Sequence, residues 1–212
     1  MVINMKREKT KKCKELNKEM SDILNKYSKQ YKFKKKSDFI WVSEKDFFFY
    51  IDFHLGITET DEALICSSRE RCKPLWTDEL LWEIMEMNEN FSAPISLRGN
   101  GAFTFYGLPY NSTGIKIDNW TAEEIEEAIG GMIYNFDKYI KSFDSNYFYK
   151  NTDKIIYHNT LFELLYLIHL KDYEKAYLYA NEMKDVYFIN KDKKLSEYAM
   201  YYCRLKMNAS TK

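Results

Sequence analysis

The clearest pattern of apolar and polar residues lies between residues 38 and 57, where it predicts an aromatic β-hairpin. From Phe47 to Ile57 every second residue is apolar, and Asp52 and His54 lie among the residues between them. This alternation with a period of two is typical of a strand that buries one face completely. The turn before this strand, residues 43–46, lacks glycine, so we expect a longer loop built on a type I turn rather than a two-residue turn.

Apolar residues at intervals of three and four predict helices along much of the remaining chain. The helix that begins near Trp120 has the best-defined start, because Thr121 and Glu124 have the spacing of a capping box. Gly130 and Gly131 in the middle of this helix predict either the close approach of a neighbouring element or a kink. The predicted helices span residues 11–31, 77–88, 121–143, 160–170, 173–186 and 195–207.

Shorter signals complete the expected secondary structure. Residues 62–67 predict a third strand, and residues 68–71 after it are expected to turn the chain out to solvent. Thr77 is expected to be the N-cap of the helix that follows. Asn100 and Gly101 form a pair that suits a tight turn, and aromatic residues alternate with others after it, so we expect a second hairpin there.

Together these elements predict an α+β fold. We expect a mostly antiparallel sheet packed by the N-terminal helix and a long central helix, followed by a C-terminal helical segment. The α+β domain is expected over residues 11–148, and a helical hairpin plus a final helix, packed on that domain, over residues 153–207. The stretch from Lys171 to Ala176 resembles the turn and second helix of a tetratricopeptide-type hairpin, and a single such repeat needs a neighbour to bury its faces.

Composition excludes several classes of protein. The 212 residues include 18 Tyr and 14 Phe but only 3 Pro and 7 Gly, so the chain is not a low-complexity disordered segment. The most apolar runs, residues 47–51 and 161–170, are too short or too interrupted by polar residues to span a bilayer, so no membrane partner is expected. The 4 cysteines lack C-x-x-C spacing and no secretory signal is recognised, which predicts reduced thiols and a cytoplasmic location.

The formal net charge of zero conceals an uneven distribution. Residues 1–36 hold 13 Lys or Arg against 4 Asp or Glu, which leaves +9 in this segment and −9 in the remainder. Two explanations stay open: the basic helix matches the acidic body of the same chain, or it binds an acidic partner or nucleic acid. No recognised nucleic-acid-binding motif accompanies these lysines, so nucleic acid is not the expected partner.

The candidate ligands for a metal ion are Asp52 and His54, which lie two residues apart on one face of the second strand. With Glu62 or Asp61 as a third ligand they could bind zinc or manganese, because imidazole and carboxylate suit these ions. The alternative is a surface pair, or a histidine that is hydrogen-bonded to its neighbours. The chain has no motif for nucleophilic catalysis or for a nucleotide-binding loop, and no cofactor is expected.

The order of a lysine-rich helix, the segment from Phe33 to Lys36, the aromatic hairpin and a later helix containing Leu80 to Trp82 resembles an uncharacterised family of small bacterial α+β domains. The resemblance covers about residues 11–148 and implies binding rather than chemistry, because some such domains look like immunity or antitoxin proteins. We therefore expect a non-catalytic module that binds another protein, either a toxin or a second copy of the chain. The alternatives are a metal-dependent enzyme with its site at the end of the second strand, and a nucleic-acid-binding protein that uses the basic N-terminal helix.

Overall fold

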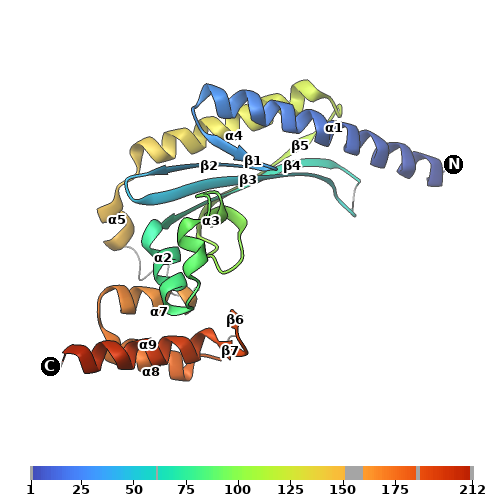
Figure 1. The fold of residues 1–212 in the computed structure, drawn as a ribbon. Coiled ribbons are helices and arrows are strands. Elements are labelled where there is room, and N and C mark those ends of the chain that lie inside the picture. The colour runs from blue at the N-terminus through green and yellow to red at the C-terminus, as the bar shows by residue number, and fades with distance from the viewer. Residues whose placement is uncertain (1, 61, 151–159, 185–186, 211–212) are drawn as a thin grey trace. The chain divides into compact units, whose positions relative to one another are not determined.

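The computed structural model describes residues 2–60, 62–150, 160–184 and 187–210 (Figure 1). It confirms the α+β class, with a five-stranded antiparallel sheet, an N-terminal helix and C-terminal helices. The described residues contain no helix that is long and apolar enough to cross a membrane. The chain forms two compact units, of which the first comprises Met1–Cys72 with Leu108–Phe143 and the second comprises Lys73–Gly107 with Asp144–Lys212.

The two units do not follow one another along the sequence. The chain leaves the sheet after its fourth strand and returns to form the fifth strand, and the segment between these strands packs with the C-terminal helices. Residues 73–107 therefore belong to the second unit, although they fall within the domain expected over residues 11–148. The reason is that apolar patterns along the chain report which residues are buried and not which elements share a core.

The first unit is built on a sheet whose five strands lie in the order in which they occur along the chain. Two long central strands of 11 residues each form its body, whereas the first strand has only 3 residues. The strands are β1 (Lys34–Lys36), β2 (Phe39–Glu44), β3 (Phe47–Ile57), β4 (Leu64–Pro74) and β5 (Leu108–Ile117).

The aromatic hairpin is formed by β2 and β3 as predicted, but its turn is shorter than expected. Glu44 lies opposite Phe47, so Lys45 and Asp46 alone make the turn. Both have positive φ angles, 52° and 63°, as in the two-residue turns whose twist matches that of the flanking strands. The expectation of a longer loop was wrong because the twist of two well-packed strands outweighs the absence of glycine.

The fourth strand is much longer than the predicted third strand, and the turn expected over residues 68–71 is wrong. These residues continue β4, with Ser68 and Glu70 buried on one face. Arg69 points to the opposite face and is exposed, whereas Arg71 is buried. Charged residues usually indicate a loop. Because Glu70 and Arg71 are charged and yet buried, residues 68–71 do not show the alternation of apolar and polar residues that identifies a strand.

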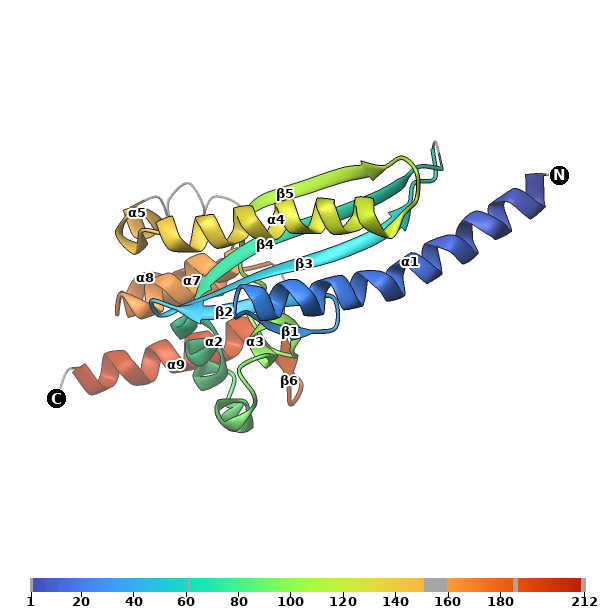
Figure 2. The ribbon, with the colours of Figure 1, turned by 90° about the horizontal axis from the view of Figure 1, so that it is seen from above.

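Two helices lie side by side over one face of this sheet (Figure 2). They are α1 (Val2–Gln30) and α4 (Ala122–Ser142). The start of α4 confirms the predicted cap, because the Thr121 hydroxyl oxygen accepts a hydrogen bond from the Glu124 backbone N–H at 3.3 Å. Phe49 of β3 packs its ring edge-on against Phe143 at the end of α4, so the apolar face of the hairpin carries these helices.

The two glycines in the middle of α4 differ in their surroundings. A Cβ atom on Gly130 would lie 2.5 Å from the hydroxyl oxygen of Tyr27 in α1, which confirms the predicted close approach of a neighbouring element. A Cβ atom on Gly131 would meet no heavy atom of the described residues within 4 Å. The packing of α1 therefore explains the first glycine and does not explain the second.

The second unit is mostly helical, and three helices are found where C-terminal helices were predicted. The helix expected over residues 173–186 ends earlier, at Glu182, and residues 185–186 lie outside the described residues. Its elements are α2 (Leu75–Ile84), η1 (Asn88–Ser92), α3 (Leu97–Asn100), α5 (Ser145–Lys150), α7 (Thr160–His169), α8 (Tyr173–Glu182), β6 (Ile189–Asn190), β7 (Lys193–Lys194) and α9 (Leu195–Ser210). In this unit α2 packs against α7 and α9, and α8 packs against the same two helices. Thr77 is not the N-cap of α2, because Pro74 holds that position and the Thr77 hydroxyl donates to the Pro74 carbonyl oxygen at 2.7 Å.

The second hairpin expected around Asn100 and Gly101 is wrong. Asn100 ends the short helix α3, and the Gly101 backbone N–H closes it by donating to the Leu97 carbonyl oxygen at 2.7 Å. Phe105 is buried in the second unit, where its ring stacks on Phe162 at 5.5 Å. Of the aromatic residues that suggested a strand, Phe105 is therefore a core residue of a loop, whereas Tyr106 is exposed. Of the expected hairpin only β5 is a strand.

Candidate functional site

The structure places Asp52 and His54 on the face of β3 opposite to the one that carries α1 and α4. The Asp52 carboxylate faces two arginines of β4. Its Oδ2 atom accepts a hydrogen bond from Arg69 Nε at 3.0 Å, and its Oδ1 atom lies 3.9 Å from Arg71 Nε. His54 is exposed. Two guanidinium groups thus already balance the charge that Asp52 would offer to a cation.

The third ligand of the predicted metal site is not brought to this pair by the described residues. Glu62 is bound by Lys9, whose Nζ atom lies 2.6 Å from its carboxylate, and Asp61 lies outside the described residues. Across the described part of the chain, no three His, Cys, Asp or Glu side chains gather so that they could hold a metal ion. A metal site at Asp52 and His54 stays a prediction.

The basic helix α1 is matched in part by carboxylates of its own unit. Besides the pair between Lys9 and Glu62, the Lys26 ammonium donates to the carboxylate of Glu126 on α4. These pairs agree with the interpretation that the basic helix is neutralised within the chain. Other basic side chains near the start of α1 are exposed, namely Arg7, Lys11, Lys12 and Lys14.

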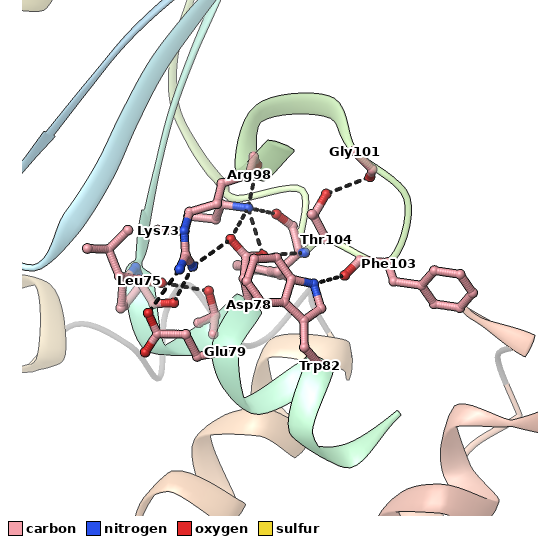
Figure 3. A network of polar contacts seen from close by, with 12 residues as sticks. Lys73, Leu75, Asp78, Glu79, Trp82, Arg98, Gly101, Phe103 and Thr104 are labelled. Carbon is pink, nitrogen blue, oxygen red and sulfur yellow. Dashed lines mark hydrogen bonds and ion pairs between the residues drawn. The ribbon is translucent and has the colours of Figure 1, made fainter. Parts of the chain in front are cut away.

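A dense polar cluster lies in the second unit around Lys73, Asp78 and Arg98 (Figure 3). The side chains of Lys73 and Asp78 are fully buried. The Lys73 ammonium donates to Asp78 Oδ1 at 2.9 Å, to the Arg98 carbonyl oxygen at 2.6 Å and to the carbonyl oxygen of Phe105. Burial lowers the pKa of Lys73 to about 8, and the neighbouring Asp78 carboxylate opposes this fall.

Arg98 joins the same cluster to helix α2 (Figure 3). Its guanidinium group donates to the Leu75 carbonyl oxygen at 2.8 Å and to Asp78 Oδ2 at 3.3 Å. The same group donates to Glu79 Oε1 at 2.9 Å and lies over the ring of Trp82, 4.8 Å from its centroid. The cluster therefore fastens the segment that carries α3 to the first turns of α2.

This cluster is built to hold structure and not to carry out chemistry. The three acceptors around Lys73 match the three N–H bonds of an ammonium group, and neither Lys73 nor Asp78 is exposed to a substrate. Sequence reasoning missed it because Lys73 and Arg98 lie on different elements and share no spacing. Asp78 lies in the first turn of α2, where a carboxylate is common because it suits the helix dipole, so its position alone does not indicate a buried partner.

The free edge of the first unit is formed by β5, which stands at the end of the strand order and has β4 as its one neighbour among the described strands (Figure 2). The strand has 10 residues, and those from Asn111 to Lys116 are exposed or half-buried. In an antiparallel strand the main-chain N–H and C=O groups of alternate residues point away from the paired neighbour. This edge therefore presents a row of donors and acceptors to a further strand.

A groove of about 500 Å³ runs between β5 and α4, next to the free edge. On the strand side the groove is lined by Ile115 and Ile117. These residues lie opposite buried residues of β4, and paired residues share a face of the sheet, so both side chains point toward the helices. Its helix wall has a gap at Gly131, where no side chain in the described part of the chain fills the space. The groove is lined by Ile115, Lys116, Ile117, Glu124, Glu127, Ala128 and Gly131.

The other end of β5 is anchored to the helix layer through a β-bulge opposite Glu70 and Arg71. The bulge brings two consecutive residues of β5 toward Glu70. Asn111 Nδ2 donates to Glu70 Oε1 at 2.9 Å, and Tyr110 stacks on Tyr139 of α4 with ring centroids 3.7 Å apart. Burial raises the pKa of Glu70, and the hydrogen bond from Asn111 offsets part of this rise.

Comparison of the chain with protein-family models, with curated proteins and with solved structures gave no match. Any functional proposal therefore rests on the geometry of the described residues. Of the features above, the Lys73 cluster is saturated, and Asp52 is balanced by arginines. The open edge of β5 and its groove combine accessible main-chain groups with an unfilled space.

Proposed function

We propose that this chain is a protein-binding module that takes an extended segment of a partner protein as an additional strand beside β5. The observation that carries the proposal is the combination of a free strand edge with a groove between that strand and α4. Strand addition uses main-chain hydrogen bonds for affinity and pockets for alternate side chains for specificity. The first unit offers both features at one place.

The two edges of the sheet support this assignment because only one of them is protected. The edge strand β1 has 3 residues and each is a lysine, and charged lysines on a short strand are a common way to prevent pairing with another chain. In β5, by contrast, no charged residue occurs from Leu108 to Ile115. Pro109 and Lys116 lie near its two ends and leave the centre of the strand open.

The expected affinity follows from the number of hydrogen bonds. A partner segment of about six residues would form about six main-chain bonds, each contributing about 1 kcal/mol net. Ordering the segment and its side chains opposes part of this gain. Six such bonds alone correspond to a dissociation constant of about 40 µM, and because ordering weakens binding we expect about 50 µM to 1 mM for a linear peptide, with tighter binding for a whole partner protein.

The partner in this proposal is another protein, and the bacterial cytoplasm is the compartment. Neutralisation of a toxin by an immunity or antitoxin protein is a process of this type, in which binding alone is the activity. The state of the cysteines supports the compartment, because Cys13, Cys66, Cys72 and Cys203 are all free thiols. A toxin partner is a proposal that the resemblance noted in the sequence motivates.

The test begins with selection of linear dodecapeptides from a random phage-displayed library against the full chain. We expect peptides whose synthetic forms bind in the stated range, and whose binding is lost when alternate peptide bonds are N-methylated, because only alternate N–H groups face the edge. Methylation at the intervening positions is the matched control. A selection without binders, or equal tolerance of methylation at all positions, would contradict strand addition.

Proline substitution on the protein side gives an independent check. Thr113 and Gly114 are adjacent in β5, so proline at one removes an N–H from the free edge and proline at the other removes an N–H from the ladder with β4. The variant that loses an N–H of the free edge should keep its thermal stability, because the ladder with β4 stays intact. We expect this variant to bind the selected peptides at least tenfold more weakly. Unchanged affinity in that variant would overturn the proposal.

A further inference from the structure

Gly131 lies in the middle of a helix, and no packing contact with the described residues requires a glycine there. Glycine at such a position costs about 0.5–1 kcal/mol relative to alanine. Its neighbour Gly130 is explained by Tyr27, whereas a Cβ atom on Gly131 would meet no heavy atom in the described part of the chain within 4 Å. The packing of the described residues therefore accounts for the first glycine and leaves open space at the second.

The position of Gly131 indicates which kind of group could occupy the open space beside it. It lines the groove opposite Ile115 and Ile117, on the side of β5 that faces the helices. A strand added beside β5 would point alternate side chains to the same side of the sheet. One of those side chains would enter the gap at Gly131, and Ile115, Ile117 and Ala128 supply the apolar part of the groove lining.

The charge on the helix wall defines a second requirement. Glu127, which lines the groove and is exposed, lies four residues before Gly131, or about 6 Å along the helix axis. Side chains two residues apart on one face of a strand are separated by about 6.5 Å. Because α4 lies along β5 (Figure 2), the spacing of the two wall positions matches that of two side chains on one added strand.

From this match we infer that the groove selects a partner segment in which an apolar side chain enters the gap at Gly131 and a Lys or Arg two residues away faces Glu127. The inference rests on the proposed strand addition and names its partner: an extended, basic and apolar segment of another protein. The local charge agrees with it, since the groove is lined by two carboxylates, Glu124 and Glu127, and by one ammonium group, that of Lys116, which pairs with Asp118 at 3.0 Å. Gly131 and Glu127 are then the residues that determine specificity.

The experiment measures peptide affinity for the full chain and for two variants. We expect the selected peptides to share an apolar residue spaced by two from Lys or Arg, and to bind at least tenfold more weakly to Gly131→Leu. This variant should fold, because the added side chain enters open space. The charge reversal Glu127→Lys should weaken binding about tenfold, and replacing the basic residue of the peptide by Glu should restore it.

Matched controls separate this inference from the proposed function. Glu123→Lys changes the charge of α4 equally, but Glu123 does not line the groove, so affinity should be unchanged. If the proline variant loses the peptide while Gly131→Leu and Glu127→Lys bind normally, strand addition stands and the assigned specificity is wrong. If none of the three affects binding, both are wrong. If the chain forms dimers and Gly131→Leu makes it monomeric, the occupant of the groove is a second copy of the chain, and the assigned partner is wrong.

Discussion

The buried cluster around Lys73 and the open edge formed by β5 use polar groups in opposite ways. In the cluster three acceptors meet the Lys73 ammonium, and Asp78 also accepts from the Phe105 backbone N–H at 2.8 Å. At the edge, main-chain groups along half of a strand face no neighbouring strand among those described, and a helix beside them lacks a side chain at Gly131. In the first region the polar groups are satisfied within the chain, whereas at the second the described strands leave main-chain groups without a strand neighbour.

The difference between the Lys73 cluster and the β5 edge indicates which features point to a function when a chain has no recognisable catalytic motif. Buried charges draw attention because their pKa values are perturbed, and active sites often show such values. Here the perturbed lysine is saturated and inaccessible, so its contribution is to stability. The more informative feature is a hydrogen-bonding capacity that the fold leaves unused.

The largest effect is expected when the closed cluster is broken. Lys73→Met leaves the Asp78 carboxylate buried with fewer partners, and loss of one member of a buried pair costs about 3–5 kcal/mol. Urea unfolding followed by tryptophan fluorescence would measure it, since the second unit contains Trp76 and Trp82. A cost below about 1 kcal/mol would show that the cluster does not hold the second unit together.

Alanine at the two adjacent glycines of α4 should give effects of opposite sign. Gly131→Ala is expected to stabilise the protein by about 0.5–1 kcal/mol, because a helix gains from alanine and the site is open. Gly130→Ala is expected to destabilise it by about 1 kcal/mol, because the new Cβ atom displaces Tyr27. Thermal unfolding of both variants measures the two changes in stability. If both changes have the same sign, the two glycines do not differ in their packing, and the reason for choosing Gly131 is lost.

The smallest effect concerns Glu70, where the anchored end of β5 meets the helix layer. Because burial raises the folded-state pKa of this carboxyl above its ordinary value of 4.5, the stability it contributes when protonated is lost as pH rises through the folded-state value. Glu70→Gln keeps an acceptor for Asn111 and never ionises. Its advantage over the parent chain in unfolding experiments should thus be absent at acidic pH and grow toward neutral pH, and a constant difference would exclude this cause.

Much of the fold could be predicted because regular patterns control it. The alternation from Phe47 to Ile57 and the capping box at Thr121 gave β3 and α4 correctly. The course of β4 could not be predicted, because Glu70 and Arg71 are charged and buried, and local patterns assign such residues to the surface.

The candidate site was visible in the sequence only in part. The glycine pair in α4 signalled a close approach, yet only three-dimensional packing shows that Tyr27 accounts for one glycine and not for the other. The free edge of β5 depends on strand order, which no local signal encodes. The predicted ligands Asp52 and His54 share a strand as expected, but the arginines opposite Asp52 came from a segment that was expected to be a turn.

The slow reactivity of the buried cysteines also makes the protein convertible into an optical sensor. Burial raises the pKa of Cys66 and Cys203 to about 11 and that of Cys72 to about 12, so these thiols react slowly at neutral pH. With the half-buried Cys13 replaced by serine, a cysteine introduced at the exposed position of Glu123 would be the site that a thiol-reactive dye labels first. A fluorophore at this position, which does not line the groove, would report occupancy of the groove in real time without filling the gap at Gly131.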